Sequence, residues 1–266
     1  MSIRKDAVAG QFYPASETEI RTIFDHYNNF LQQNIQDKTI LTLQPRAFIV
    51  PHAGYVYSAF TANVALSLLK NTKAKRVVVI GPSHRVYLEG TSVAMFQSYE
   101  TPLGHLTIDT EFSQKLIDRF AFHFQKDAHM EHSTEVQMPF IKHYLSESLV
   151  VELVYGKEEA SHLAKAIEYI LQEKENIVII STDLSHYHDI HQANRLDNIC
   201  LQAVQKLHPE ILYQGCEACG KIGVEAMLIA AKKLQLKAKI LDYRTSADAS
   251  GDTEQVVGYM SAVFIE

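Results

Sequence analysis

This chain of 266 residues has few cysteines, no long apolar run and no excess of basic side chains. Three cysteines are few and odd in number, which argues against a disulfide framework and leaves the thiols free for ligation or redox work. No window approaches the ~20 apolar residues of a membrane span, and the first eight residues carry charges instead of an apolar segment. The sequence therefore predicts a cytoplasmic protein without a membrane partner.

The balance of charge excludes a second class of partner. Lys and Arg number 25 against 31 Asp and Glu, so the formal net charge is -6. Without a basic patch or a block of like charges, the chain has no electrostatic footprint for nucleic acid. What it does have is a 47% hydrophobic composition, enough to bury a substantial core, and 13 histidines. Those that lie in polar breaks beside apolar runs are His52, His84, His132 and His186.

Buried strands and amphipathic helices alternate along the chain. Continuous apolar runs, typical of strands covered on both faces, predict strands at 47–50, 76–80, 149–154 and 177–180. Further strands are expected at 91–96, 239–243 and 255–265. Apolar residues at helical spacing predict helices at 16–31, 59–69, 109–120, 158–173, 192–207 and 222–234. A helix that connects two strands of one sheet crosses over the sheet and makes those strands parallel. With no linker or repeat, we expect one domain over 1–266, an α/β/α sandwich with a largely parallel mixed sheet.

Two of the predicted strands deliver histidines to one edge of the sheet. His52 follows the strand at 47–50 directly after Pro51, and His84 follows the strand at 76–80. Parallel strands end at a common edge, where open α/β sheets bind their ligands, so we expect these strands to be neighbours or one strand apart. Two imidazoles and one anion are the minimum for a metal ion with open coordination positions.

Cys219 is the candidate for the anionic ligand. It lies near the start of the helix predicted at 222–234, where the helix dipole lowers the pKa of a thiol and favours the thiolate. Cys216 and Cys219 also form a C-x-x-C pair, which permits thiol–disulfide chemistry or a second sulfur ligand. Cys200 is expected in the core. The alternative for the whole set is structural: histidines that bind strand-end carbonyls and a packed cysteine.

Proton transfer indicates a further set of candidates. His186 is a candidate because imidazole side chains in general exchange protons near neutral pH, and Asp183 could orient it; the alternative is a capping Asp beside a surface histidine. His132 is expected at a helix start, where it would donate a proton, orient a substrate or belong to a polar cap. Tyr55 and Tyr57 are candidates for a substrate-binding wall, the alternative being ordinary packing.

A series of motifs runs in a fixed order along nearly the whole chain. They are AVAGQFYP at 7–14, PHAGYVYS at 51–58, GPSH at 81–84, YETPLG at 99–104, EHSTEVQMPF at 131–140, STDLSHY at 181–187, CG at 219–220 and VGY at 257–259. In this order they resemble the Memo family, whose members are similar in fold to the LigB class of non-haem iron extradiol dioxygenases.

The resemblance implies that His52, His84 and Cys219 face a metal ion, and that His186 stands where the related dioxygenases carry their catalytic base. Iron or copper is the expected ion, zinc is a third option, and no organic cofactor is expected. A cysteine replaces the carboxylate ligand of those dioxygenases, and its softer sulfur also suits copper(I) or zinc. We therefore expect a metal-dependent oxidoreductase or related enzyme. The alternative is a non-catalytic protein that binds a metal, a peptide or a small molecule in the same pocket.

Overall fold

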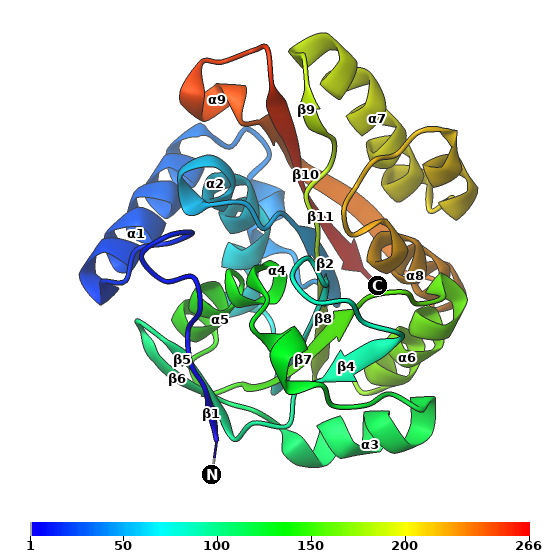
Figure 1. Ribbon diagram of the computed structural model, residues 1–266. Coiled ribbons are helices and arrows are strands. Elements are labelled where there is room, and N and C mark those ends of the chain that lie inside the picture. The colour runs from blue at the N-terminus through cyan, green and yellow to red at the C-terminus, as the bar shows by residue number, and fades with distance from the viewer. Residues whose placement is uncertain (1) are drawn as a thin grey trace.

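The computed structural model describes residues 2–266 and has a large mixed sheet between layers of helices (Figure 1). Its strands are β2 (Ala47–Val50), β3 (Arg76–Pro82), β4 (Thr91–Val93), β7 (Leu149–Tyr155), β8 (Asn176–Ser181), β9 (His186–His188), β10 (Lys237–Thr245) and β11 (Val256–Ile265). Across the sheet the order is β10-β11-β2-β8-β3-β7-β4, and β9 pairs with β11. The predicted α/β architecture with a mixed sheet is confirmed.

The centre of the sheet is parallel and its margins are antiparallel. β2, β8, β3 and β7 pair in parallel, whereas β11 and β4 pair antiparallel to β2 and β7. The central strands are buried on both faces, which explains why they appear in the sequence as unbroken apolar runs. The predicted edge strand at 91–96 exists, but it is shorter and ends at Val93.

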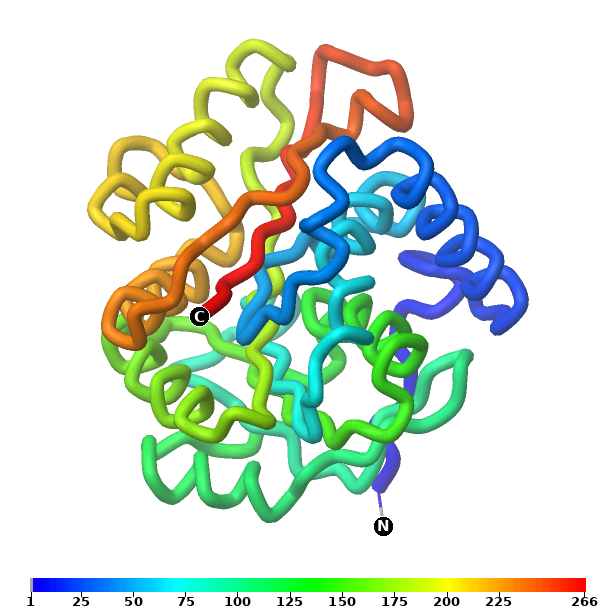
Figure 2. The backbone as a smooth tube through the Cα atoms, turned by 180° about the vertical axis from the view of Figure 1, so that it is seen from behind, coloured from blue at the N-terminus to red at the C-terminus, as the bar shows by residue number. Residues whose placement is uncertain are grey.

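Helices cover both faces of the sheet and divide the core in two. One face carries α1 (Glu17–Asn34), α2 (Tyr55–Leu66) and α5 (Met138–Tyr144). The other carries α3 (Thr110–Phe120), α6 (Ala160–Gln172), α7 (Ile190–Lys206) and α8 (Lys221–Lys233). Phe48 packs into the first core and its neighbour Ile49 into the second, as the alternation of strand side chains requires. From behind, blue α1 and yellow α7 lie on opposite sides of the red C-terminal strand (Figure 2).

Shorter elements complete the chain. A small sheet joins β1 (Ile3–Arg4), β5 (Ser98–Thr101) and β6 (Gly104–Thr107). The short helices are α4 (His132–Glu135) and α9 (Ala247–Ser250), with 3-10 turns η1 (Lys38–Thr42), η2 (Ser67–Asn71), η3 (Lys126–His129) and η4 (Pro209–Gln214). Side-chain caps fix the start of two helices: Ser16 accepts from the Glu19 N–H at 3.4 Å before α1, and Asp109 accepts from the Phe112 N–H at 2.9 Å before α3. Within residues 2–266, every helix is too short or too polar to cross a bilayer.

The cysteines overturn one expectation. Cys200 is buried, as predicted, but it forms a disulfide with Cys216, and their Cα atoms lie 5.1 Å apart. The chain turns back after α7 at Leu207, which has a left-handed backbone, and η4 returns Cys216 to the side of α7. The prediction of free thiols was therefore wrong for this pair, because it rested on the number of cysteines and not on this reversal. Cys219 is free, so the C-x-x-C pair is not a disulfide.

Candidate metal site

The carboxyl ends of three adjacent strands form the floor of the site. β8 lies between β2 and β3 and is parallel to both, so the two histidine-bearing strands are one strand apart. His52 and His84 follow β2 and β3, and their ring centroids lie 5.2 Å apart. Asp183 follows β8 between them. The predicted meeting of the two histidines at one sheet edge is confirmed.

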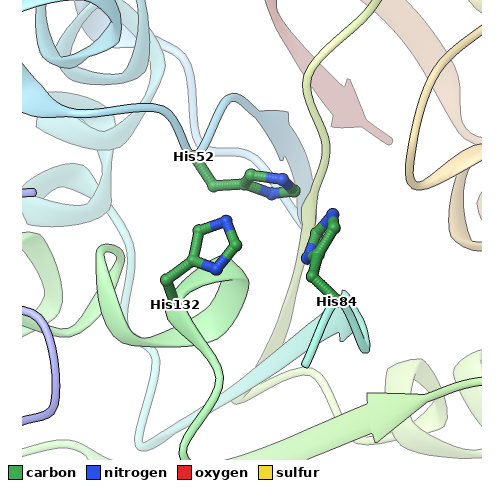
Figure 3. A group of neighbouring side chains, drawn as sticks. All are labelled: His52, His84 and His132. Carbon is green, nitrogen blue, oxygen red and sulfur yellow. The ribbon is translucent and has the colours of Figure 1, made fainter. Parts of the chain in front are cut away.

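A third histidine joins the pair from a different part of the chain. His132 begins α4, as predicted, and its ring centroid lies 5.4 Å from that of His52 and 4.7 Å from that of His84. One ring nitrogen of each residue lies within 4.8 Å of the others. The three rings point toward one another (Figure 3). His52 is buried, His132 is partly buried and His84 is exposed, so the cluster reaches solvent on the His84 side.

Cys219 approaches the cluster from beside α8. Its Sγ lies 3.3 Å from Nε2 of His52 and accepts the backbone N–H of Asp183, also at 3.3 Å. A Cβ on the next residue, Gly220, would lie 2.6 Å from the Cβ of Thr182, so a glycine is needed for this close approach. The sequence predicted that Cys219 would lie near His52, and the structure brings the two together.

The predicted low pKa of the Cys219 thiol was wrong. Burial, reinforced by the charge of Asp183, raises the pKa of Cys219 to about 12. The N-cap of α8 is Gly220, so Cys219 lies before the helix and packs under the segment that follows β8. Desolvation therefore dominates over the helix dipole at this position.

A serine hydroxyl determines which ring nitrogen of His52 carries the hydrogen. The Ser181 hydroxyl donates its single proton to the Ser133 carbonyl and accepts from Nε2 of Gln137 at 2.9 Å. Ser181 Oγ also lies 3.1 Å from Nδ1 of His52, so it accepts Nδ1–H and leaves the His52 Nε2 lone pair free. Burial, with the nearby charges of His84 and His132, lowers the pKa of His52 well below its usual value, which favours the neutral ring that a metal requires.

In the sequence, Glu131 was noted only as the first residue of the motif at 131–140. Its buried side chain caps α4 and also accepts the backbone N–H of His84 at 2.6 Å. Burial alone would raise the pKa of Glu131, but the close contact with the His132 ring and the hydrogen bonds from His84 outweigh it and hold that pKa well below its usual range. The only sequence signal was an acidic residue just before a helix, which predicts a cap but not a second contact 47 residues away.

The predicted acid–base residues, Asp183 and His186, lie beside the histidine cluster but are not hydrogen-bonded to each other in the described chain. Asp183 accepts the backbone N–H of His52 at 2.7 Å, and burial raises the pKa of its carboxyl group. His186 begins β9, which pairs with β11, and it lies near enough to Asp183 and His52 for its protonated form to influence the pKa of each. In the described chain no hydrogen bond links Asp183 to His186. Their catalytic roles stay predictions.

The two candidate wall tyrosines differ in exposure. Tyr55 is buried against the rings of Tyr13 and Phe140, and its hydroxyl donates to the Val136 carbonyl at 2.8 Å. Tyr57, in the first turn of α2, is 45% exposed. Only the Tyr57 side chain is therefore accessible to a ligand from solvent, and a substrate contact by either residue stays a prediction.

Comparison with known proteins gives matches over the full length. A family model described as Memo-like protein covers residues 4–263. A MEMO1 family protein of Methanobrevibacter smithii is 36% identical, over 98% of this chain and 99% of its own. Proteins of the same name from Thermoplasma volcanium and Aquifex aeolicus are 32% and 31% identical, over 98% and 100% of both chains. With this identity and coverage, the chain belongs to the Memo family.

Proposed function

We propose that this protein binds a transition-metal ion at the carboxyl edge of its sheet and uses it as an oxidoreductase. One observation carries the proposal: ring nitrogens of His52, His84 and His132 lie within 4.8 Å of one another, and the Cys219 sulfur lies 3.3 Å from His52. The resemblance to LigB-class dioxygenases implies a metal ion at the same edge of the sheet.

The residues present fit a metal of this class. Metal–nitrogen bonds are about 2.0–2.1 Å and metal–sulfur bonds about 2.3 Å, so ligands of one ion lie roughly 3–4 Å apart. The histidine nitrogens need only a small closure to reach that spacing. Imidazole and thiolate suit iron, copper and zinc, whereas magnesium and calcium prefer oxygen ligands. We propose His52 and His84 as fixed ligands and Cys219 as the third, with His132 as its competitor for that position.

The surrounding residues have distinct proposed tasks. When bound, iron or copper supplies one-electron redox chemistry, whereas zinc supplies Lewis-acid activation. His186 is proposed to move a proton to or from a substrate, and Asp183 to fix the segment that carries His52 through its bond to the His52 N–H. If Cys219 completes the ligand set, His132 is free to orient a substrate on the solvent side. Tyr57 is the accessible aromatic contact.

Metal analysis tests the proposal. Protein purified without chelator or a nickel column is expected to hold about one iron or copper ion per chain, and His52→Ala or His84→Ala to lose it. Comparison of Cys219→Ser with His132→Asn identifies the third ligand, because only loss of the ligand lowers the metal content. His208→Ala, at an exposed site paired with Glu210, is the matched control. Unchanged metal in His52→Ala would sink the proposal.

A second candidate function is ligand binding without turnover. Exposed apolar side chains follow two of the strands that form the floor: Val56 and Tyr57 beyond β2, and Tyr187 beyond β8, with exposures of 78%, 45% and 73%. Such side chains would suit a small molecule or a peptide. Turnover that disappears in His186→Ala would favour the enzyme, and ligand binding with background oxygen consumption would favour the binding protein. The cytoplasmic location and the lack of nucleic-acid or membrane partners stay predictions from composition.

A further inference from the structure

A single buried carboxylate contacts two of the three histidines. Glu131 is 1% exposed, and its Oε1 lies 3.1 Å from Nδ1 of His84 and 2.8 Å from Nδ1 of His132. The contact with His132 is as short as an ion pair, but it lacks the alignment of a regular hydrogen bond. Both oxygens also accept backbone N–H groups, Oε2 from His84 at 2.6 Å and Oε1 from Ser133 at 3.1 Å.

These contacts select one tautomer of both rings. A carboxylate oxygen that already accepts a backbone N–H is an acceptor, so each imidazole that faces it presents Nδ1–H. A neutral imidazole has one N–H, and the Nε2 atoms of His84 and His132 therefore keep their lone pairs. Ser181 imposes the same tautomer on His52 by an independent contact. All three rings would then offer Nε2 to a common point.

We infer that Glu131 is a positioning residue, which fixes the tautomer and orientation of His84 and His132 so that both Nε2 atoms face the metal position. The inference rests on the proposed function for the identity of the ligand, although the tautomers exist without it. Capping α4 requires only the bond to Ser133, and shorter Asp, Asn, Ser or Thr side chains are the usual caps. The longer glutamate side chain also reaches His84 and His132.

Glu131→Gln tests the inference, because the amide cannot accept at both ends. The shorter backbone bond, 2.6 Å from His84 N–H, places the amide oxygen at the Oε2 position. The NH₂ group then faces the two rings and donates to Nδ1, which shifts both toward the Nε2–H tautomer. Loss of such an outer contact costs about 10- to 100-fold in metal affinity. Glu131→Asp, whose carboxylate is too short to hold both rings, is expected to release at least one of them from the fixed Nδ1–H tautomer, with a smaller loss of metal affinity.

The tautomers are measured by long-range ¹⁵N–¹H NMR on metal-free protein at mildly alkaline pH, with signals assigned from His84→Gln and His132→Gln. Metal affinity is measured separately by competition with a chromophoric chelator. Glu152→Gln is the matched control, because Glu152 is a buried carboxylate 2.9 Å from Nδ1 of His129, outside the cluster. It is expected to leave the tautomers of His84 and His132 unchanged.

The outcomes separate the two proposals. Retained Nδ1–H on both rings in Glu131→Gln overturns the positioning role, whatever the metal does. Reversed tautomers in a protein whose wild type binds no metal support the positioning role and overturn the proposed function. If Glu131→Gln does not fold, Glu131→Asp decides, since a carboxylate too short to reach the rings must release at least one of them; unchanged tautomers and affinity there overturn the role.

Discussion

Glu152 shows how a single buried charge is stabilised in this fold. It lies in β7 and is fully buried, with His129 Nδ1 at 2.9 Å, the Thr134 hydroxyl donating to it and the Tyr99 hydroxyl at 3.4 Å. Burial alone would raise the pKa of Glu152, but the charge and hydrogen bond of His129, with Arg4 nearby, lower it below the ordinary value of 4.5. Stability is therefore linked to the ionisation of this carboxyl group.

The sign of that linkage gives a pH prediction. Because the folded pKa is lower than the unfolded one, the contribution of Glu152 is fully present above about pH 4.5 and is lost as pH falls through the folded pKa. Glu152→Gln removes a buried carboxylate from its contacts with His129 and Thr134 and should cost about 1–3 kcal/mol near neutral pH. The difference in unfolding free energy between wild type and variant, measured by urea titration, should shrink below pH 4.5. A difference that is constant with pH would contradict the assignment.

At the residue scale the sequence predicted the strand-end histidines but not their orientation. His52 and His84 follow apolar runs, and the geometry of parallel strands places such residues at one edge. Glu131 was missed because its contact with His84 depends on how α4 packs beside β3. The thiol pKa of Cys219 was misjudged because desolvation depends on neighbours that are distant in the sequence.

At the scale of elements, the packing of η4 against α7 is the clearest example of an arrangement that the sequence did not predict. The sequence predicted α7 from its apolar stripe but did not predict η4. Their packing was not predicted either, since the reversal at Leu207 depends on a left-handed residue that sequence periodicity does not reveal. The disulfide between Cys200 and Cys216 follows from that packing. By contrast, the central strands could be predicted, because burial on both faces leaves continuous apolar runs in the sequence; these strands are β2, β3, β7 and β8.

The disulfide gives a prediction for these elements. The two cysteines are 16 residues apart, and closing a loop of about that length stabilises a fold by about 3 kcal/mol in the chain-entropy account. A Cys200→Ala/Cys216→Ala double variant should lose roughly that much unfolding free energy in urea. Wild-type protein unfolded without reductant should react as one thiol, that of Cys219, and as three after reduction. Three reactive thiols before reduction would refute the pairing.

For the whole molecule, the site joins segments that are far apart in the sequence. Its candidate ligands run from His52 to Cys219, 167 positions apart, and come from β2, β3, α4 and the segment before α8. The parallel order of the sheet explains the meeting of the two strand-end histidines. His132 arrives from a connection outside the strands, and sequence periodicity could not place it there. An ion bound by this set would link elements on both faces of the sheet.

This linkage predicts that metal stabilises the entire fold. A ligand that binds only the folded state at about 100 times its Kd adds about 2.7 kcal/mol to the unfolding free energy. At about 2–4 °C per kcal/mol for a chain of this size, the melting temperature should rise by roughly 5–10 °C and return when a chelator is added. His52→Ala should abolish the shift, whereas His208→Ala should keep it, because His208 lies outside the cluster. An equal shift in His52→Ala, measured by calorimetry, would show that the ion binds elsewhere.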